Sequence, residues 1–312
     1  MKLAGSYSSQ RTNLPALLRE VVCLYRMHAT SVPERVRASV AELRRVEAEI
    51  ERRFAFPLRD RDVLDVGVGQ LLPQARYFSC ANRVIGIDFD VIAQGPNPLL
   101  YLRMLAKNGP RRTAKTILRK LSGVDRRFRS EMERYLGSRL APRLPVLHMD
   151  VCAMRFPGAS FDFVHCYSVV HSLPDPGRAL DEIARVLRPG GLAYLSLHLY
   201  TSETGSLDPR LFTSRRSEIP PWSHLRPTLA GAIRPNAFLN RLRLAQWRAL
   251  FEQHLPGSVL VLTPASRAGG EEDARQLLEQ GELSGFSLEE LLTHRVEVFW
   301  PKASEPVAAT SP

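Results

Sequence analysis

Apolar residues recur along the chain with two different periods, and each period predicts a kind of element. Residues 15–28 and 33–53 show the spacing of amphipathic helices, with an apolar residue every three or four positions. In the second segment a charged face accompanies an apolar one made of Val36, Val40, Leu43, Val46 and Ile50. Pro33 suits the first turn of that helix. We therefore expect a helical N-terminal segment over residues 1–60 that packs on the core or covers the site.

From Asp62 onward, short apolar runs alternate with helical stretches. Helices are predicted over 72–80 and 178–187, and strands over 63–66, 83–88, 145–149, 161–167 and 191–197. Further along we expect a helix, a strand, a helical stretch and a last strand, over 241–255, 258–262, 271–292 and 295–300 respectively. Such alternation is typical of an α/β fold with a doubly wound parallel sheet and right-handed crossovers. Ligands of these sheets bind at the carboxyl ends of the strands.

Two stretches interrupt the alternation. Residues 91–143 have helical spacing and many basic residues, and residues 201–240 are rich in Pro, Ser, Thr and Arg, as in a long ordered lid loop. We expect both to belong to one large domain over residues 61–300, followed by a tail over 301–312. The insertion and the lid are predicted to cover the active face.

The net charge of +11 is concentrated in one place. The segment 91–143 contains thirteen Arg or Lys and three acids, and the rest of the chain is close to neutral. Such a segment can bind an anionic membrane surface, a phosphate-bearing substrate or RNA, or it can be a solvated helical cap. The 44% of hydrophobic residues is ordinary for a globular protein.

Localisation and metal content are predicted from what the sequence lacks. No apolar run approaches the length needed to cross a bilayer, and the first residues have no apolar signal core. The four cysteines are far apart and form no Cys-x-x-Cys pair, so we expect no metal site and no disulfide. We expect a cytoplasmic protein with no transmembrane segment, peripheral to the membrane if the basic segment binds lipid.

The first predicted strand leads into a glycine loop, Asp65-Val-Gly67-Val-Gly69. Glycines allow the backbone to pass close beneath a ligand. A dinucleotide-binding loop would have a third glycine at position 72, which is Leu72 here. Asp88 closes the next strand 21 residues after Gly67, close to the spacing expected of an acid that binds ribose hydroxyls. The loop alone is compatible with several nucleotide ligands.

Further motifs follow in order. They are His148-Met-Asp-Val-Cys152, Phe161-Asp-Phe-Val164, Leu173-Pro-Asp-Pro176 and Leu187-Arg-Pro-Gly-Gly191. Together with the glycine loop and Asp88, the segment from about 62 to 200 resembles the class I S-adenosylmethionine-dependent methyltransferases, in particular bacterial domains of the type 11 kind. The resemblance implies a Rossmann-like, seven-stranded methyltransferase sheet with S-adenosyl-L-methionine as cofactor.

By that resemblance, ten residues line the cofactor pocket. Those before the basic segment are Asp65, Gly67, Val68, Gly69, Asp88 and Phe89, and those after it are Asp150, Val151, Tyr167 and Ser168. Asp88 is expected to accept the ribose hydroxyls, and Phe89 to pack on the adenine. Tyr167 and Ser168 are expected to face the methionine end.

The chain departs from the family pattern at two places. Leu71 stands where the family often has a third glycine, which alters the turn. His171-Ser172 stands where the family often has an acid–His pair, which leaves the chemistry near the methyl group open.

Two histidines are candidates for a general base, His171 after the fourth strand and His198 at the end of the fifth. Either one can equally be a structural histidine. In the lid, Trp222 with His224 and Arg226 can form an aromatic platform with a polar clamp, or the fixed core of a long loop.

The expected reaction is O-methylation of a small-molecule or glycan hydroxyl. One rival function is RNA methylation through the basic segment, which is less favoured because the chain shows no Asn-Pro-Pro-Tyr-like motif and no appended RNA-binding module. A second is a non-catalytic protein that keeps the cofactor pocket. The sequence indicates neither the acceptor nor the oligomeric state.

Overall fold

The computed structural model describes residues 32–213, 215–235, 237–265 and 267–304. The helix predicted over 15–28 and the tail beyond residue 304 lie outside the described residues. The described part of the chain divides into two compact units. The first unit contains residues 32–165, 185–192 and 302–304, and the second contains 166–184 and 193–301. The predicted division into a lead-in, a methyltransferase domain and a tail stays a prediction.

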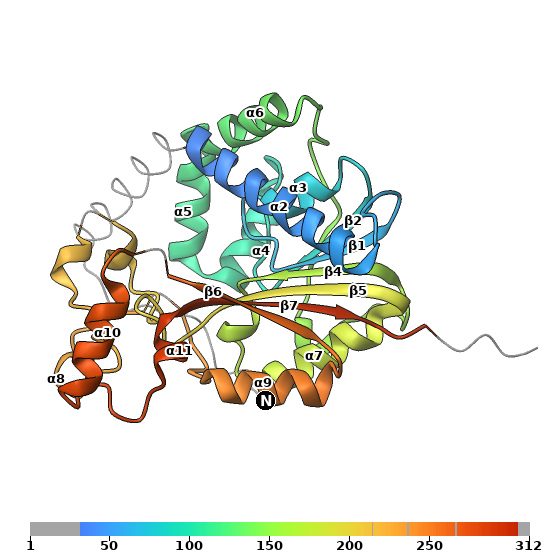
Figure 1. The fold of residues 1–312 in the computed structure, drawn as a ribbon. Helices are drawn as coiled ribbons and strands as arrows, with labels where there is room; N and C mark the ends of the chain where they lie inside the picture. Colours follow the sequence, from blue (N-terminus) through green and yellow to red (C-terminus); the bar gives the residue numbers. More distant parts are fainter. Residues whose placement is uncertain (1–31, 214, 236, 266, 305–312) are drawn as a thin grey trace, which may run out of the picture. The chain divides into compact units, whose positions relative to one another are not determined.

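Seven strands form one mixed sheet in the order β3-β2-β1-β4-β5-β7-β6 (Figure 1). The strands are β1 (Asp62–Val66), β2 (Arg83–Asp88), β3 (Val146–His148), β4 (Phe161–Tyr167), β5 (Leu187–His198), β6 (Val259–Pro264) and β7 (Thr293–Pro301). β2 pairs in parallel with β1 and with β3, whereas β6 and β7 are antiparallel. This order confirms the predicted seven-stranded, Rossmann-like α/β sheet.

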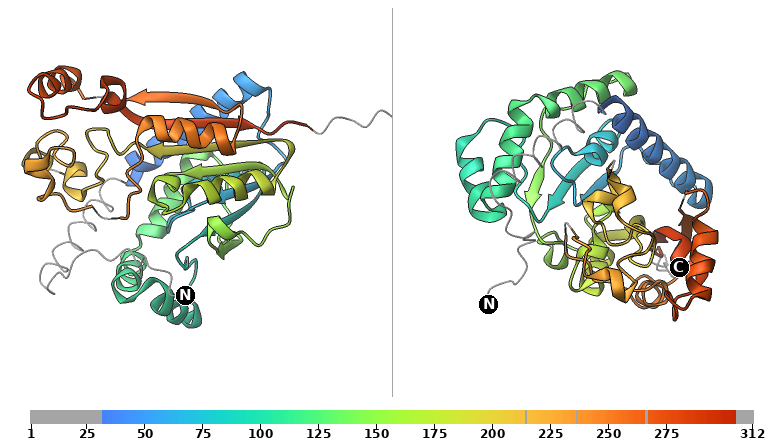
Figure 2. Two further views of the ribbon diagram at one scale, coloured as in Figure 1. Left: turned by 90° about the horizontal axis from the view of Figure 1, so that it is seen from below. Right: turned by 90° about the vertical axis from the view of Figure 1, so that its left-hand side faces the viewer.

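The helices of the first unit begin with α2 (Val32–Phe54) and α3 (Pro73–Phe78). The basic segment then forms α4 (Pro98–Asn108), α5 (Pro110–Leu121) and α6 (Val124–Leu136), three consecutive helices between β2 and β3 (Figure 2). The apolar face of α2 is buried as its spacing predicts, and its first half packs on α6 through Val36, Val40, Phe128 and Met132. The lead-in helix is therefore part of the core that holds the basic segment.

The helices of the second unit include α9 (Leu244–His254), α10 (Gly270–Glu279) and α11 (Leu288–Leu292). The continuous helical stretch predicted over 271–292 is wrong. Gly281 and Gly285 have φ of 76° and 88°, a left-handed backbone that ends α10 and keeps the next turn out of a helix. Ser287 then starts α11 with a capping box, in which its hydroxyl accepts from the Glu290 N–H.

Between β4 and β5, α7 (Pro176–Val186) ends one residue earlier than predicted and β5 starts at Leu187. The Arg-Pro-Gly-Gly segment is therefore the first part of the strand. Arg188 Nη1 lies 2.9 Å from Asp62 Oδ2 and 2.8 Å from Asp162 Oδ1, at the amino ends of β1 and β4. Gly191 has no room for a side chain, since a Cβ there would be 2.8 Å from the Asp162 carbonyl oxygen. This contact joins two of the sequence motifs to each other.

Candidate cofactor and acceptor site

The glycine loop leaves β1 and turns sharply against β2. Gly67 and Gly69 have φ of 74° and 61°, which favours glycine at both positions. The N–H of Gly67 donates to the Ile87 carbonyl over 2.8 Å, so the loop is fastened to the end of β2. Val68, between the glycines, is buried. The loop is thus held as a defined turn at the carboxyl ends of β1 and β2.

Asp88 fastens the same loop from the other side. Its Oδ2 accepts the Gly69 N–H over 2.9 Å, and its Oδ1 accepts the Asp90 N–H over 2.8 Å. Each oxygen keeps further acceptor capacity for a hydroxyl of a ligand. Burial raises the pKa of this carboxyl to about 6, against two backbone hydrogen bonds that lower it. Asp88 is therefore held in a fixed orientation beside the glycines.

The turn after the glycines differs from the glycine-rich one that the family often has. Leu72, and not Leu71, takes the left-handed conformation, with φ of 58° and ψ of 41° at the start of α3. This costs a non-glycine residue about 1–2 kcal/mol. The side chain of Leu72 is fully buried, and its packing offsets that cost.

Asp65 lies at the end of β1, with only 1% of its surface exposed. His165 of β4, itself fully buried, places Nδ1 2.8 Å from Asp65 Oδ1. Asp65 Oδ2 has no hydrogen-bond partner among the residues that the structure describes. A buried carboxylate is costly unless it is paired, so His165 stabilises the strand end that carries the glycine loop. His165 was not predicted as a site residue, although a histidine inside the apolar run Phe-Val-His-Cys indicates a buried polar pair.

The remaining predicted cofactor residues of the first unit lie at the ends of β2 and β3. Asp88 is in register with His148 across the two strands, which brings Phe89 near the end of β3. The Phe89 ring is half exposed, with its centroid 6.4 Å from that of His148. Asp150 Oδ1 accepts the Cys152 N–H over 2.9 Å and caps the short helix η1 (Val151–Ala153), whose Val151 is buried. Whether these groups contact an adenine stays a prediction.

Tyr167 and Ser168 belong to the second unit. Ser168 has φ of 59°, and its N–H donates to the Ser196 carbonyl over 2.7 Å. Left-handed non-glycine residues of this kind gather at functional sites. The guanidinium of Arg295 lies over the Tyr167 ring, 4.8 Å from its centroid.

Three histidines of the second unit form one cluster, in which His171 is buried and His198 and His294 are partly buried. The ring centroids of His198 and His294 are 4.3 Å apart, and His198 Nε2 is 2.9 Å from Thr204 Oγ1. His171 Nδ1 accepts the backbone N–H of His198 over 3.3 Å. The structure therefore brings the two predicted base candidates together and adds His294, which the sequence analysis did not consider.

Burial determines the protonation state of this cluster. It lowers the pKa of His171 to about 4, and burial followed by the charge of His294 lowers that of His198 to about 3. Both rings are neutral near pH 7. A general base works best with a pKa near the working pH, so His198 is suited to orienting a hydroxyl more than to taking its proton.

The lid contains a cavity of about 550 Å³ between residues 200 and 241. Tyr200, His224 and Phe238 are among its lining residues, and the Arg241 guanidinium lies 5.8 Å from the Tyr200 ring centroid. Trp222 is only 1% exposed and packs with Leu283 and Leu291. Of the two interpretations of Trp222, the buried core residue fits the structure, and Tyr200 supplies the aromatic wall.

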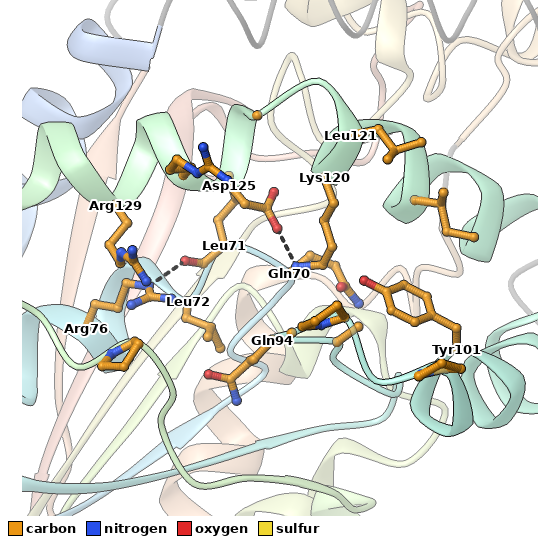
Figure 3. Close-up of a pocket in the computed structure, with 18 residues that line it drawn as sticks. Gln70, Leu71, Leu72, Arg76, Gln94, Tyr101, Lys120, Leu121, Asp125 and Arg129 are labelled. Atoms are coloured by element: carbon orange, nitrogen blue, oxygen red, sulfur yellow. Dashed lines mark hydrogen bonds and ion pairs between the residues drawn. The ribbon is translucent and has the colours of Figure 1, made fainter.

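A second cavity of about 630 Å³ lies in the first unit, beside the turn that follows the glycine loop (Figure 3). Its charged lining residues are one acid and four cations, namely Asp125, Arg76, Lys120, Arg126 and Arg129. Lys120 is paired with Asp125 over 2.8 Å. Burial lowers the pKa of Arg76, and the nearby charge of Arg129 lowers it further. Two guanidinium groups that repel each other in a cavity favour an anionic ligand.

Comparisons with known proteins point to methyltransferases. Residues 109–195 match the family described as "Methyltransferase domain". An uncharacterized chloroplastic methyltransferase of Arabidopsis thaliana is 38% identical over 72 residues, which is 23% of this chain and 20% of that protein. A probable S-adenosylmethionine-dependent methyltransferase of Mycolicibacterium smegmatis is 25% identical over 147 residues, 47% of this chain and 42% of that protein.

The chain spans less than half the length of these curated relatives. Among solved structures, a SAM-dependent methyltransferase from Thermotoga maritima is 16% identical with a TM-score of 0.44, covering 92% of this chain and 99% of that one. The family match begins at residue 109, so it includes α5 and α6 and excludes the glycine loop.

The strand order and the family match define a class of protein. The chain carries a class I S-adenosylmethionine-dependent methyltransferase domain. S-adenosylmethionine is the cofactor of that class, and a methyl acceptor is its second substrate. No helix in the described ranges is long and apolar enough to cross a membrane.

Proposed function

We propose that this protein transfers a methyl group from S-adenosylmethionine to a hydroxyl oxygen of a small molecule or glycan. The observation that carries the proposal is the setting of Asp88. Its two oxygens are oriented by the N–H groups of Gly69 and Asp90, and both retain capacity for a ribose hydroxyl. Within the first unit, Asp65, Gly67, Val68, Gly69 and Asp88 lie at the ends of β1 and β2, and this placement supports the assignment of the cofactor to this loop.

The bound cofactor supplies a methyl group on a sulfonium, and the protein has to hold the acceptor oxygen in line with it. We assign the acceptor to the lid cavity, because Tyr200 and Phe238 offer apolar walls, and Arg241 and Asn240 offer polar groups. Asn240 also fixes the loop after β4, since its Nδ2 donates to the carbonyl of Val170 over 2.9 Å. We assign His198 to the acceptor side as a neutral ring that positions the lid through Thr204; His198 itself is not one of the residues that line the cavity.

The basic segment widens the range of acceptors. The cavity beside Arg76 and Arg129 suits a phosphate group, so the basic segment can bind a phosphate-bearing substrate or an anionic membrane surface. The same cations favour RNA methylation as the second candidate function. A non-catalytic role is the third candidate, since His171 is buried with its pKa near 4 and the family's acid–His pair is absent.

The cofactor assignment is tested by Asp88→Ala. Loss of two charge-assisted hydrogen bonds should weaken binding of S-adenosylhomocysteine by about 2–4 kcal/mol in titration calorimetry. Asp181→Ala, which removes an exposed carboxylate of α7, is the control and should leave the affinity unchanged. Equal affinities in all three proteins would refute the assignment.

The acceptor class is tested by transfer of a labelled methyl group to lipid, carbohydrate and RNA fractions of a cell extract. Label in a carbohydrate or small-molecule fraction supports O-methylation, and label in RNA supports the second candidate. No transfer by a chain that binds S-adenosylhomocysteine would support the non-catalytic role. His198→Ala should lower turnover and leave cofactor affinity intact, because the ring is assigned to the acceptor alone.

A further inference from the structure

Helix α5 has its apolar and polar faces in the reverse of the usual orientation. Its buried residues are Thr113 and Thr116. Its exposed side includes Ala114, Ile117, Leu118 and Leu121, which follow one another at the three-to-four-residue spacing of a single helical face. Leu121 is 81% exposed. A helix of a globular protein normally buries such a stripe, so the outward face of α5 is built to contact something else.

Helix α4 packs beside α5 and also points leucines outward. Leu99 and Leu102 are 72% and 62% exposed, and Leu105 is exposed as well, whereas Met104 is the buried residue of this helix. We call the outward side chains of the two helices the apolar ridge; they are Leu99, Leu102, Leu105, Ile117, Leu118 and Leu121. Exposed apolar groups concentrated on adjacent helices mark an interaction surface.

The charges around the apolar ridge indicate the partner. Arg103 and Lys107 of α4 are exposed, and Lys115 of α5 stands beside the ridge residues. Arg119 and Lys120 of α5 are paired with Asp125. Two ridge residues, Ile117 and Leu121, also line the cavity that contains Arg76 and Arg129. Apolar side chains interleaved with lysine and arginine are typical of helices that lie in the interface of an anionic bilayer.

The same charges disfavour two other partners of the apolar ridge, the N-terminal residues 1–31 and a second copy of the chain. Residues 1–31 carry Lys2, Arg11, Arg19 and Arg26 against the single acid Glu20, so they would bring positive charge to a positive surface. A second copy of the ridge would do the same. Charge complementarity therefore favours an anionic lipid surface over both.

We propose that α4 and α5 dock this protein on an anionic bilayer, with the apolar ridge in the headgroup–acyl boundary and the adjoining cavity open to a lipid phosphate. The proposal rests on the membrane contact of residues 91–143 proposed above, and it does not depend on methyl transfer. The cations supply attraction to the surface, and the leucines supply burial of apolar area.

The test is sedimentation of the full chain with vesicles, with no cofactor present. One set of vesicles contains phosphatidylglycerol and phosphatidylcholine, and the other phosphatidylcholine alone. We expect binding to the anionic set, weakened by salt. The double variant L102S/I117S should bind at least about tenfold more weakly, because it removes buried apolar area. Phe212→Ser, an equally exposed aromatic outside the ridge, is the matched control and should bind as the wild type does.

Several outcomes would overturn the proposal. These are no binding to anionic vesicles, equal binding to both sets, or an equal loss in Phe212→Ser. Self-association in sedimentation velocity that L102S/I117S abolishes, without vesicle binding, would assign the ridge to a second copy. Circular dichroism checks that the variant is folded. Calorimetry with S-adenosylhomocysteine runs in parallel, so that failure of the membrane proposal is distinguished from failure of the methyltransferase proposal.

Discussion

Gly86 of β2 lies against Val68 of the glycine loop, and Gly86→Ala tests how tightly that loop is packed. An added Cβ would lie 2.5 Å from Val68 Cγ1 and 3.3 Å from Val146 Cγ2. An ordinary contact of this kind is 3.4–4 Å, so Val68 has to move by about 1 Å. Val68 stands between Gly67 and Gly69, and its movement shifts the Gly69 N–H that donates to Asp88.

Two quantities should therefore change. Overpacking should lower the free energy of unfolding by about 1–3 kcal/mol, measured by urea denaturation. Displacement of the loop should weaken S-adenosylhomocysteine binding by about tenfold, since one misplaced charge-assisted hydrogen bond amounts to about 1.5 kcal/mol. Gly231→Ala is the control, because its Cβ meets nothing within 4 Å and its φ is −64°.

A double variant decides whether the contact with Val68 is the cause. Val68→Ala removes the clashing methyl group and by itself should cost about 1–2 kcal/mol of stability. In V68A/G86A the new Cβ occupies part of the space that the Val68 side chain leaves. The loss of stability in the double variant should therefore be smaller than the sum of the two single losses by at least about 1 kcal/mol. Strictly additive costs, or wild-type cofactor affinity in Gly86→Ala, would refute this account of the loop.

Three further variants or conditions test other parts of the structure. Because the pKa of Asp88 is about 6 and its ionised form is proposed to accept the ribose hydroxyls, S-adenosylhomocysteine affinity in calorimetry should fall about tenfold from pH 8 to pH 5; a flat profile would contradict the assignment. His165→Ala should cost about 3–5 kcal/mol in urea unfolding, because it leaves the Asp65 carboxyl buried and unpaired. His254→Ala, which leaves an exposed carboxylate, should cost much less, and equal losses would speak against the buried pair. Gly205→Ala should lower the melting temperature markedly, because its Cβ would be 1.9 Å from the Tyr200 carbonyl oxygen; an unchanged melting curve would show that the turn can relax.

The elements that sequence analysis predicted well are those whose signal is local. The β2 and β4 strands were predicted to the residue, because each is a short apolar run bounded by polar or turn residues. The segment 271–292 was predicted wrongly as one helix, although Gly281, Gly285 and the Ser287–Glu290 capping box were present in the sequence. The apolar periodicity of that stretch outweighed its breakers in the prediction.

Of the candidate site, only the parts that are linked by their spacing along the chain were predictable from the sequence. The glycine loop and Asp88 are 21 residues apart and could be joined by spacing. The cluster of His198 and His294 joins residues far apart in sequence, and no local pattern indicates it. The outward apolar face of α5 was equally hidden, because periodicity shows that a helix has an apolar side but not which way that side points.

The ion pairs of Arg188 with Asp62 and Asp162 bear on how relatives are classified by sequence motif. They tie together the beginnings of β1, β4 and β5, at the edge of the sheet opposite the glycine loop. The Leu-Arg-Pro-Gly-Gly and Phe-Asp-Phe-Val motifs are therefore architectural signatures. A descendant that had lost its methyl acceptor, or its activity altogether, would still need them to assemble its sheet. A sequence search that relies on these two motifs therefore selects the fold, and does not by itself select for methyl transfer.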